Sequence, residues 1–328
     1  MAEAWMTKVG VVFPGQGSQY VGMAREILAE PDAAPKATDL FRRAEEITGL
    51  PLARLCLEGP EETLRQTDVT QPALLVASVA AWSLLEGPLM AHFEERPLLA
   101  AGHSLGEFSA LVAAGAMQFD DACRLVRERG RLMAEAARQN PGAMAAVLGL
   151  AAEDVVNACR AAEEETGEVI QPANFNCPGQ VVISGTSAGM AAASDKLRAA
   201  GARRIVPLAV SGAFHTTLLG GAAAEFSGLL NEVPLKQPRF PVVQNVTAVA
   251  TDDPEQIRDN LRRQMASPVR WDEGLRQMAV AGVSVFVEVG PGKVLAGLVK
   301  KTLPDAVALN VEGLVDGKKA LDFLEGGR

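Results

Sequence analysis

The feature that most constrains the fold of this chain is a recurring order of short β-rich run, glycine-rich turn and helical pattern. This order occurs near the start, near residue 100 and towards the end of the sequence. The strands are expected at residues 8–13, 98–101 and 283–289, and the helices that follow them from about Ser18, at 107–114 and at 294–301. Two further helices are expected at 72–85 and 120–137. Strands that alternate with helices in this way predict an α/β fold with a mostly parallel sheet.

The middle of the chain follows a different order. Strands are predicted at 143–150, 169–174, 180–185 and 203–208, and helices at 153–165 and 188–200. The order βαββαβ is that of a ferredoxin-like unit. We therefore expect a large α/β catalytic domain from residues 1–140 and 210–328, with a ferredoxin-like small subdomain inserted at 141–209. The active site is expected in the cleft between them, since ligand sites often lie at such boundaries.

Composition narrows the class of protein. Hydrophobic residues make up 48% of the 328 residues, which is enough for a large core, and the formal net charge of −9 disfavours nucleic acid and anionic membranes as partners. No run of eighteen apolar residues appears, and residues 1–10 do not resemble a secretory signal. The four cysteines are far apart and there are only three histidines. We therefore expect a cytoplasmic protein with free thiols and no metal site.

The sequence Gly102-His103-Ser104-Leu105-Gly106 matches the G-x-S-x-G pattern of a nucleophile elbow. It follows a predicted strand and opens a predicted helix, which is the context that such an elbow requires. The two glycines allow a sharp turn that lifts the serine hydroxyl clear of the backbone. The helix start supplies free N–H groups that favour a developing oxyanion. Ser104 is therefore a candidate nucleophile.

A serine nucleophile needs a base, and three histidines are available. His92 lies in a charged stretch typical of surface, and His103 is adjacent to Ser104, where neighbouring side chains on a turn usually diverge. His215 lies in a loop after a predicted strand and before a helix, so elimination favours it. The nearest acidic residue in the sequence is Glu225, so no Ser-His-Asp triad is evident. A dyad oriented by an amide or a carbonyl is expected instead.

Two glycine-rich loops fail as nucleotide-binding motifs. The loop that begins at Gly15 has Tyr20 in place of the third glycine of G-x-G-x-x-G. The loop that begins at Gly290 has Val294 in place of the magnesium-binding Ser or Thr of a P-loop. No nucleotide cofactor is therefore expected.

Three arginines, Arg127, Arg129 and Arg131, lie on the predicted helix after the elbow. Arg127 and Arg131 share a face, and Arg129 points elsewhere. Solvated surface is the default interpretation for each of them, and periodicity does not select a functional one.

Seven motifs in this order resemble the malonyl-CoA:acyl carrier protein transacylase family and the related acyltransferase domains of polyketide synthases. They begin at Phe13, Gln71, Gly102, Arg129, Asn174, Gly212 and Val289, and read FPGQGSQ, QPAL, GHSLGE, RGRLM, NFN, GAFH and VGPG. The resemblance covers about residues 8–310. It implies a hydrolase-like α/β domain with a ferredoxin-like insertion, in agreement with the element order.

The resemblance also implies roles for individual residues. Ser104 would be the nucleophile and His215 its base, with the main-chain carbonyl of Gln264 orienting the imidazole. The backbone N–H groups of Gln16 and Leu105 would form the oxyanion hole. Arg129 would hold the free carboxylate of the malonyl group, and the remaining substrate-binding residues would be Gln71, Asn174, Asn176 and Phe214.

The implied activity is transfer of a malonyl group from malonyl-CoA to the phosphopantetheine thiol of acyl carrier protein in fatty acid synthesis. The expected partners are therefore malonyl-CoA, CoA and acyl carrier protein, with no bound cofactor and a monomeric enzyme. In related polyketide domains the tetrad H-A-F-H accompanies malonyl selection. Ala213-Phe214-His215 matches its last three positions, and Gly212 departs from the first.

Three alternatives remain open. The chain could be a trans-acting acyltransferase of a polyketide pathway, or an α/β-hydrolase-type esterase or thioesterase that passes the acyl group to water. The hydrolase alternative usually needs an acid between serine and histidine in a loop after a late strand, where this chain carries the predicted insertion. A non-catalytic scaffold is the third alternative, and the presence of Ser104, His215 and Arg129 argues against it.

Overall fold

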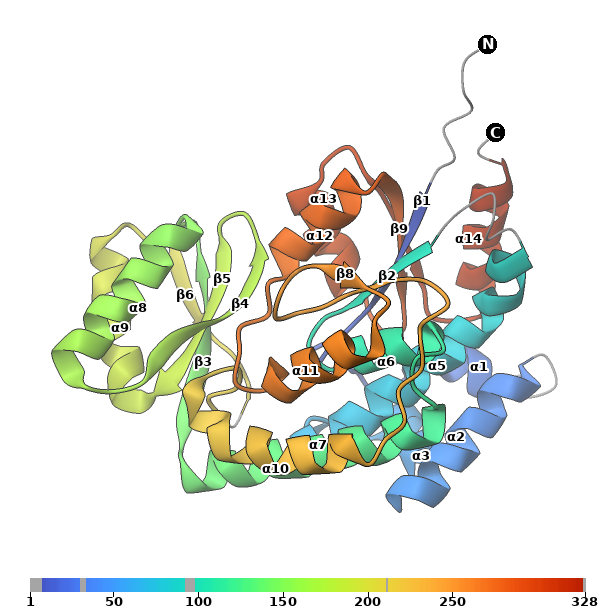
Figure 1. Ribbon diagram of the computed structural model, residues 1–328, viewed down its shortest axis with the longest axis horizontal. Helices are drawn as coiled ribbons and strands as arrows, with labels where there is room; N and C mark the ends of the chain where they lie inside the picture. The colour runs from blue at the N-terminus through green and yellow to red at the C-terminus, as the bar shows by residue number, and fades with distance from the viewer. Residues whose placement is uncertain (1–7, 30–33, 92–97, 211, 327–328) are drawn as a thin grey trace, which may run out of the picture.

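The larger part of the computed structural model is built on a six-stranded sheet in the order β10-β9-β1-β2-β7-β8 (Figure 1). The structure describes residues 8–29, 34–91, 98–210 and 212–326. The strands are β1 (Lys8–Phe13), β2 (Leu98–Gly102), β7 (Val242–Val243), β8 (Ala250–Thr251), β9 (Val283–Val289) and β10 (Val307–Val311). Only the β7–β8 pair is antiparallel in this sheet. The mostly parallel α/β sheet predicted from the sequence is therefore confirmed.

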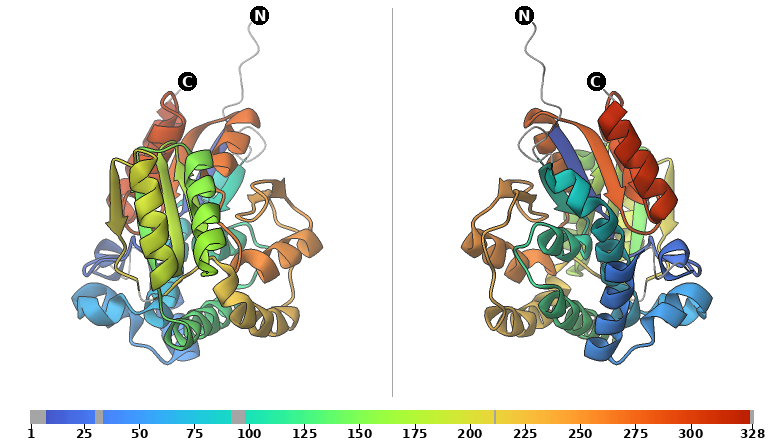
Figure 2. Two further views of the ribbon diagram at one scale, coloured as in Figure 1. Left: turned by 90° about the vertical axis from the view of Figure 1, so that its left-hand side faces the viewer. Right: turned by 90° about the vertical axis from the view of Figure 1, so that its right-hand side faces the viewer.

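Helices cover both faces of this sheet, and the right-hand view of Figure 2 shows the C-terminal helix, in red, beside its strands. Val9, Val11 and Phe13 of β1 face one core and Val12 faces the other, because side chains alternate along a strand. The first core is formed by α1 (Arg25–Ala29), α2 (Pro35–Thr48), α3 (Leu52–Glu58), α4 (Glu61–Leu64), α5 (Thr67–Ala91), α6 (Gly106–Ala113), α7 (Phe119–Gln139), α10 (Gly220–Asn231), α11 (Pro254–Gln264) and α14 (Leu314–Gly326). The second core is formed by α12 (Trp271–Val280) and α13 (Val294–Thr302).

A second, four-stranded sheet lies to one side of the first (Figure 1). It is formed by β3 (Gly142–Leu148), β4 (Ile170–Cys177), β5 (Gln180–Thr186) and β6 (Arg204–Pro207), and its helices are α8 (Ala152–Thr166) and α9 (Ser187–Ala199). Its strand order β4-β5-β3-β6, antiparallel throughout, is that of a ferredoxin-like unit. One face packs on α8 and α9, and Met144, Ala146 and Val182 on the other face join the first core of the larger part.

Backbone hydrogen bonds join β4 to the chain that follows α11. Phe175 N donates to Val269 O at 2.9 Å, and Val269 N donates to Ala173 O at 2.8 Å. This parallel bridge fixes the end of β4, which carries Asn174 and Asn176, close to the larger sheet. The two sheets are thus tied together beside the segment that also carries Gln264.

The helix expected from about Ser18 was wrong. Residues 18–24 form turns, and α1 begins at Arg25. Gly22 has φ 105° and Ala24 has φ 60°, and these left-handed conformations interrupt any continuous right-handed helix. The amphipathic pattern of the sequence gives no sign of such backbone reversals.

Helix α5 begins five residues earlier than predicted and runs through Pro72. A proline inside a helix removes the hydrogen bond to the carbonyl four residues before it, here Asp68. Arg127 Nη1 donates to that Asp68 oxygen at 2.6 Å, so the carbonyl keeps a partner. α5 is long and apolar enough to cross a membrane by length and composition alone, but 67% of its most apolar window is buried inside the fold, as in a core helix.

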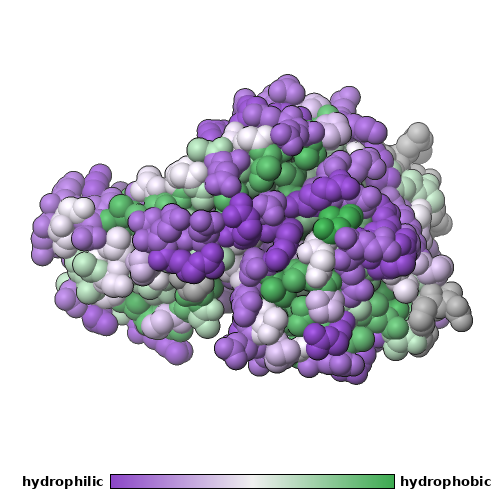
Figure 3. Space-filling model, turned by 90° about the horizontal axis from the view of Figure 1, so that it is seen from below, coloured by the Kyte–Doolittle hydropathy of each residue, from purple (hydrophilic) through white to green (hydrophobic). Residues whose placement is uncertain are grey.

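The face below α7 and α10 is shown in Figure 3. Hydrophobic residues appear there as separate patches among hydrophilic ones, rather than as one continuous apolar surface. Arg131 on α7 forms ion pairs with Glu128, Glu135 and Glu225. The four cysteines are buried and unpaired, as expected from their spacing.

The close packing of α6 on β1 predicts that a side chain at Gly106 would destabilise the fold. A Cβ at Gly106 would lie 2.1 Å from Phe13 O, which is main chain and cannot rotate away. We expect Gly106→Ala to lower the free energy of unfolding by about 1–3 kcal/mol or more. Gly297→Ala in α13 is the control, because no neighbouring atom lies within 4 Å of its Cβ position. Urea denaturation of both variants measures the difference, and equal midpoints would contradict the prediction.

Candidate active site

Ser104 stands at the turn between β2 and α6. Its φ of 51° is left-handed, which is rare for a residue with a side chain and is typical of a nucleophile elbow. The turn is closed by backbone hydrogen bonds, from His103 N to Phe13 O at 3.0 Å and from Glu107 N to Ser104 O at 3.1 Å. The strand, the turn and the first turn of α6 therefore hold the serine as one unit.

The Ser104 hydroxyl meets the imidazole of His215, as elimination among the histidines predicted. Ser104 Oγ lies 2.8 Å from His215 Nε2. His215 Nδ1 lies 3.1 Å from two main-chain oxygens, those of Gln264 and Ser267. Carbonyl oxygens only accept hydrogen bonds, so Nδ1 carries the proton and Nε2 is free to accept one from the serine. No carboxylate hydrogen-bonds this imidazole within the described residues.

Burial and the nearby Arg129 guanidinium lower the pKa of His215 to about 3. Its side chain is almost fully buried, at 4% exposure. The imidazole is therefore neutral at physiological pH, which is the form that can take up the serine proton.

Arg129 enters the site from α7, and the surface interpretation of this residue was wrong. It is 1% exposed, whereas Arg127 pairs with Asp68 and Arg131 with glutamates nearer the surface. Two residues along a helix turn the side chain by about 200°, so Arg129 points inward where its neighbours point outward. Periodicity could show that Arg129 differed, but not that it faced a serine.

The Arg129 guanidinium is held by neutral groups. Nη1 donates to Gln71 Oε1 at 2.8 Å, and Nη2 donates to Gln264 Oε1 at 2.9 Å and to Ser104 Oγ at 3.1 Å. Its central carbon, Cζ, also lies over the Phe108 ring, 5.7 Å from the centroid. Burial lowers the pKa of Arg129 to about 10, so the group remains charged. It presents a buried positive charge that has no direct carboxylate partner in the part of the chain that the structure describes.

A cavity of about 80 Å³ surrounds these groups. Its lining includes Gln16, Leu105, Asn174 and Phe214 together with Ser104, Arg129 and His215. The backbone N–H groups of Gln16 and Leu105 have no acceptor in the part of the chain that the structure describes. They are therefore available to a ligand oxygen beside Ser104.

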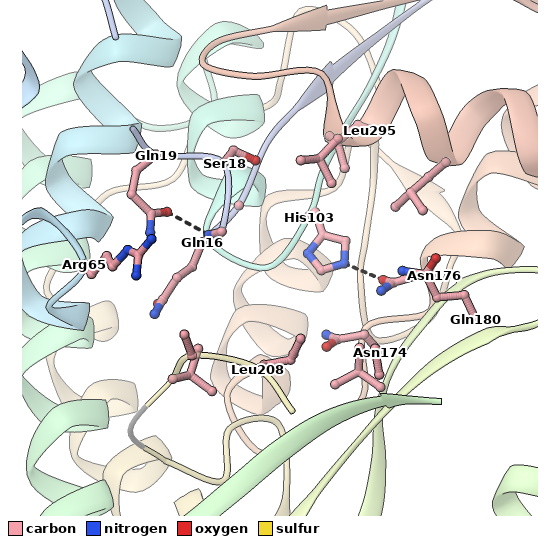
Figure 4. A pocket seen from close by; sticks show the side chains of 18 residues that line it. Gln16, Ser18, Gln19, Arg65, His103, Asn174, Asn176, Gln180, Leu208 and Leu295 are labelled. Atoms are coloured by element: carbon pink, nitrogen blue, oxygen red, sulfur yellow. Dashed lines mark hydrogen bonds between the residues drawn. The ribbon is translucent and has the colours of Figure 1, made fainter. Parts of the chain in front are cut away.

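A second pocket, of about 370 Å³, adjoins the first and shares Gln16, His103 and Asn174 with it (Figure 4). It lies between the larger part and the four-stranded sheet, which contributes Asn174 and Asn176. His103 Nε2 is 2.9 Å from Asn176 Oδ1, so the His103 side chain turns away from Ser104 into this pocket, as expected for adjacent residues on a turn. His92 lies outside the described residues.

Sequence reasoning missed two buried polar residues at the site. Asn245 follows β7 and contacts both Gly102 and Ser104, and Glu107 lies in the first turn of α6 beside the Gln264 side chain. Glu107 is the last residue of the GHSLGE motif, and the family resemblance assigns it no role. No local pattern points to Asn245, because it comes from a segment 141 residues away from Ser104.

Comparison with known proteins places the chain in a family. Residues 11–320 match the family model described as acyl transferase domain, which defines the class of protein. A malonyl CoA-acyl carrier protein transacylase of Haemophilus influenzae is 43% identical over 319 residues, covering 97% of this chain and 100% of that protein. The chain belongs to the family of malonyl CoA-acyl carrier protein transacylases.

Solved structures of similar proteins support the same family. An acyl carrier protein S-malonyltransferase from Vibrio cholerae has a TM-score of 0.88 and 44% identity, covering 96% of this chain and 100% of that one. A malonyl-transacylase in complex with its type II PKS acyl-carrier protein has a TM-score of 0.88 and 41% identity, covering 96% and 99%. The fold is therefore shared over nearly the whole length.

The environment of His215 predicts its titration. Because its folded pKa lies below the ordinary value of 6.5, the imidazole stays neutral in the native protein as the pH falls through 6.5. The unfolded chain takes up a proton there, so this group's contribution to stability is lost as the pH falls below about 6.5. We expect NMR of the folded protein to show no titration of His215 between about pH 7 and pH 5. The urea-unfolded protein is the control, and a folded-state midpoint near 6.5 would contradict the assignment.

Proposed function

We propose that this acyl carrier protein S-malonyltransferase moves the malonyl group through an ester on Ser104. The observation that carries the proposal is the 2.8 Å contact between Ser104 Oγ and the acceptor nitrogen Nε2 of His215, with Arg129 Nη2 3.1 Å from the same oxygen. A nucleophile, its base and a fixed positive charge thus meet in one small buried cavity.

In the first half-reaction, His215 Nε2 takes the proton as Ser104 Oγ attacks the thioester carbonyl of malonyl-CoA. The carbonyl oxygen becomes an oxyanion, which the N–H groups of Gln16 and Leu105 stabilise. The carbon–sulfur bond then breaks, the sulfur receives the proton from His215, and CoA leaves as a thiol. The malonyl group remains as an ester on Ser104.

In the second half-reaction, the phosphopantetheine thiol of acyl carrier protein replaces CoA. His215 takes the thiol proton as the sulfur attacks the ester carbonyl, and the same N–H groups stabilise the oxyanion. The bond to Ser104 Oγ breaks and the serine recovers its proton from His215. The pocket of about 370 Å³ beside the catalytic cavity suits the pantetheine arm common to both thiols.

Arg129 accounts for the choice of malonyl over acetyl. A guanidinium can hold a carboxylate through two parallel hydrogen bonds, and the free malonyl carboxylate would replace the present contact with Ser104 Oγ. An acetyl group would leave this buried charge without its partner. Gln71 and Phe214 border the same guanidinium and cavity, and so limit how the acyl group lies.

A polyketide pathway is the second candidate setting for the same chemistry. It is favoured by the similar malonyl-transacylase that was solved with its type II PKS acyl-carrier protein. The two settings differ in the carrier protein and not in the acyl-transfer site. We further propose that the enzyme is monomeric and cytoplasmic. We expect it to need no cofactor, since the named side chains supply every proton and charge that the reaction requires.

The covalent step predicts that Ser104→Ala forms no malonyl-enzyme. Removing Oγ leaves no group at the elbow to form the ester, while the fold is kept. Intact-protein mass spectrometry after mixing with malonyl-CoA should show one added malonyl group on the wild type and none on the variant. A malonylated Ser104→Ala protein would refute the mechanism.

The recognition step predicts a loss of selectivity in Arg129→Ala. Loss of one charged, hydrogen-bonded contact costs about 1.5–3 kcal/mol. The preference for malonyl-CoA over acetyl-CoA, as a ratio of kcat/KM values, should therefore fall about tenfold to a hundredfold or more. Arg131→Ala, two residues along the same helix and paired at the surface, should leave the ratio unchanged. Equal ratios in Arg129→Ala and the wild type would rule out this role.

A further inference from the structure

The left-handed conformation of Ser104 must be held by its surroundings, because the backbone alone disfavours it. Both peptide groups that flank this residue are bound by side-chain amides from distant parts of the chain. Ser104 N donates to Asn245 Oδ1 at 2.7 Å, and Ser104 O accepts from Gln264 Nε2 at 3.0 Å. These contacts span 141 and 160 residues of sequence, so tertiary structure fixes the elbow.

The Asn245 amide spans the elbow. Its Nδ2 donates to Gly102 O at 2.6 Å while its Oδ1 accepts from Ser104 N. Asn245 is 5% exposed, so water does not compete freely for either contact. Ser104 N is thereby occupied, which leaves Leu105 N as the elbow amide that is free for an oxyanion.

The Gln264 side chain joins the elbow to Arg129. Its Nε2 faces two acceptors, Ser104 O and Glu107 Oε2, and its Oε1 accepts from Arg129 Nη2 at 2.9 Å. An amide with acceptors on one side and a donor on the other has only one satisfactory orientation. This contact of the side chain is separate from the main-chain carbonyl of Gln264, which faces His215.

Glu107 holds both residues, Gln264 by its side-chain amide and Asn245 by its main-chain N–H. Its Oε2 accepts from Gln264 Nε2 at 2.9 Å and from Asn245 N at 3.1 Å, and the side chain is fully buried. Its Oε1 has no partner among the described residues. Burial raises the pKa of this carboxyl to about 7, so keeping it here is costly, and the proposed reaction steps do not use it. The Glu107 carboxyl lies across the Gln264 amide from the Arg129 guanidinium.

We propose that Glu107 and Asn245 are positioning residues that hold the nucleophile and the carboxylate-binding arginine in reactive geometry, Glu107 through the Gln264 side chain and Asn245 by direct contact with the elbow. Neither residue touches the reacting atoms. The proposal rests on the proposed function, because it concerns the same serine and arginine. It separates two effects, since the Asn245 side chain contacts the elbow, whereas the Glu107 side chain is linked to both the elbow and Arg129 through the Gln264 amide.

The test measures the rate and amplitude of malonyl-enzyme formation in a rapid-quench experiment, for Glu107→Ala, Glu107→Gln and Asn245→Ala. We expect the full amplitude in all three, with the two alanine variants acylating about tenfold to a hundredfold more slowly. The malonyl-over-acetyl ratio should fall roughly threefold to tenfold in Glu107→Ala, because the arginine keeps its charge but loses its orientation, and should be unchanged in Asn245→Ala. Glu107→Gln keeps an acceptor oxygen and should recover most of the rate.

Ser109→Ala is the matched control, since Ser109 is buried on the same helix and its hydroxyl has no partner in the described chain. It should acylate at the wild-type rate. Wild-type acylation rates in Glu107→Ala and Asn245→Ala would overturn the proposal. A reduced amplitude at an unchanged rate would overturn it too, because that result means only that less of the protein is folded.

If Glu107→Ala does not fold, Gln264→Leu tests the same link, because it removes the bridging amide and keeps the main-chain carbonyl. It should acylate slowly and lose selectivity, with the imidazole of His215 still neutral by NMR, and wild-type behaviour would refute the bridge. If the wild-type enzyme forms no malonyl ester, the proposed function itself is wrong. If the wild-type enzyme and all the variants acylate at the same rate, only the positioning role is wrong.

Discussion

The site depends on one backbone constraint, the left-handed turn at Ser104 between a buried strand and a helix. This turn places the hydroxyl above the end of the sheet, where His215 from a separate loop can reach it. Closure of the turn requires a glycine at position 106, where α6 passes over the Phe13 carbonyl. It also requires hydrogen-bond partners for the N–H and the C=O of Ser104, which Asn245 and Gln264 supply. The reactive geometry is therefore a property of the packed sheet and helices, and not of the five-residue motif alone.

The second constraint is electrostatic. A buried guanidinium is costly, and Arg129 is stabilised by neutral amides and an aromatic face, with Glu107 beyond the Gln264 amide. This arrangement keeps the charge in place without a direct carboxylate partner among the described residues, as the proposed binding of a substrate carboxylate requires. The same charge lowers the pKa of His215 and so helps to keep the base neutral. In the proposed mechanism, recognition of the acyl group and activation of the nucleophile are thus coupled through Arg129.

Much of this arrangement could be predicted from the sequence. The order of strands and helices predicted both sheets, because alternation and periodicity are local properties, and elimination among the histidines selected His215. The proposed role of Arg129 rests on family resemblance, since helical periodicity shows which side chains share a face but not which groups that face contacts. The helix expected at Ser18 failed because the positive φ values of Gly22 and Ala24 leave no trace in hydrophobic periodicity. Asn245 was missed because its contacts to the elbow depend on how distant segments pack.

The most direct test of the account is a crystal structure of the enzyme after reaction with malonyl-CoA. The account predicts continuous electron density from Ser104 Oγ to the acyl carbon, with the carbonyl oxygen of the ester between the N–H groups of Gln16 and Leu105. The free carboxylate should face the Arg129 guanidinium in a two-point contact. A malonyl group bound to a different residue, or one on Ser104 whose carboxylate points away from Arg129 into the larger pocket, would contradict it.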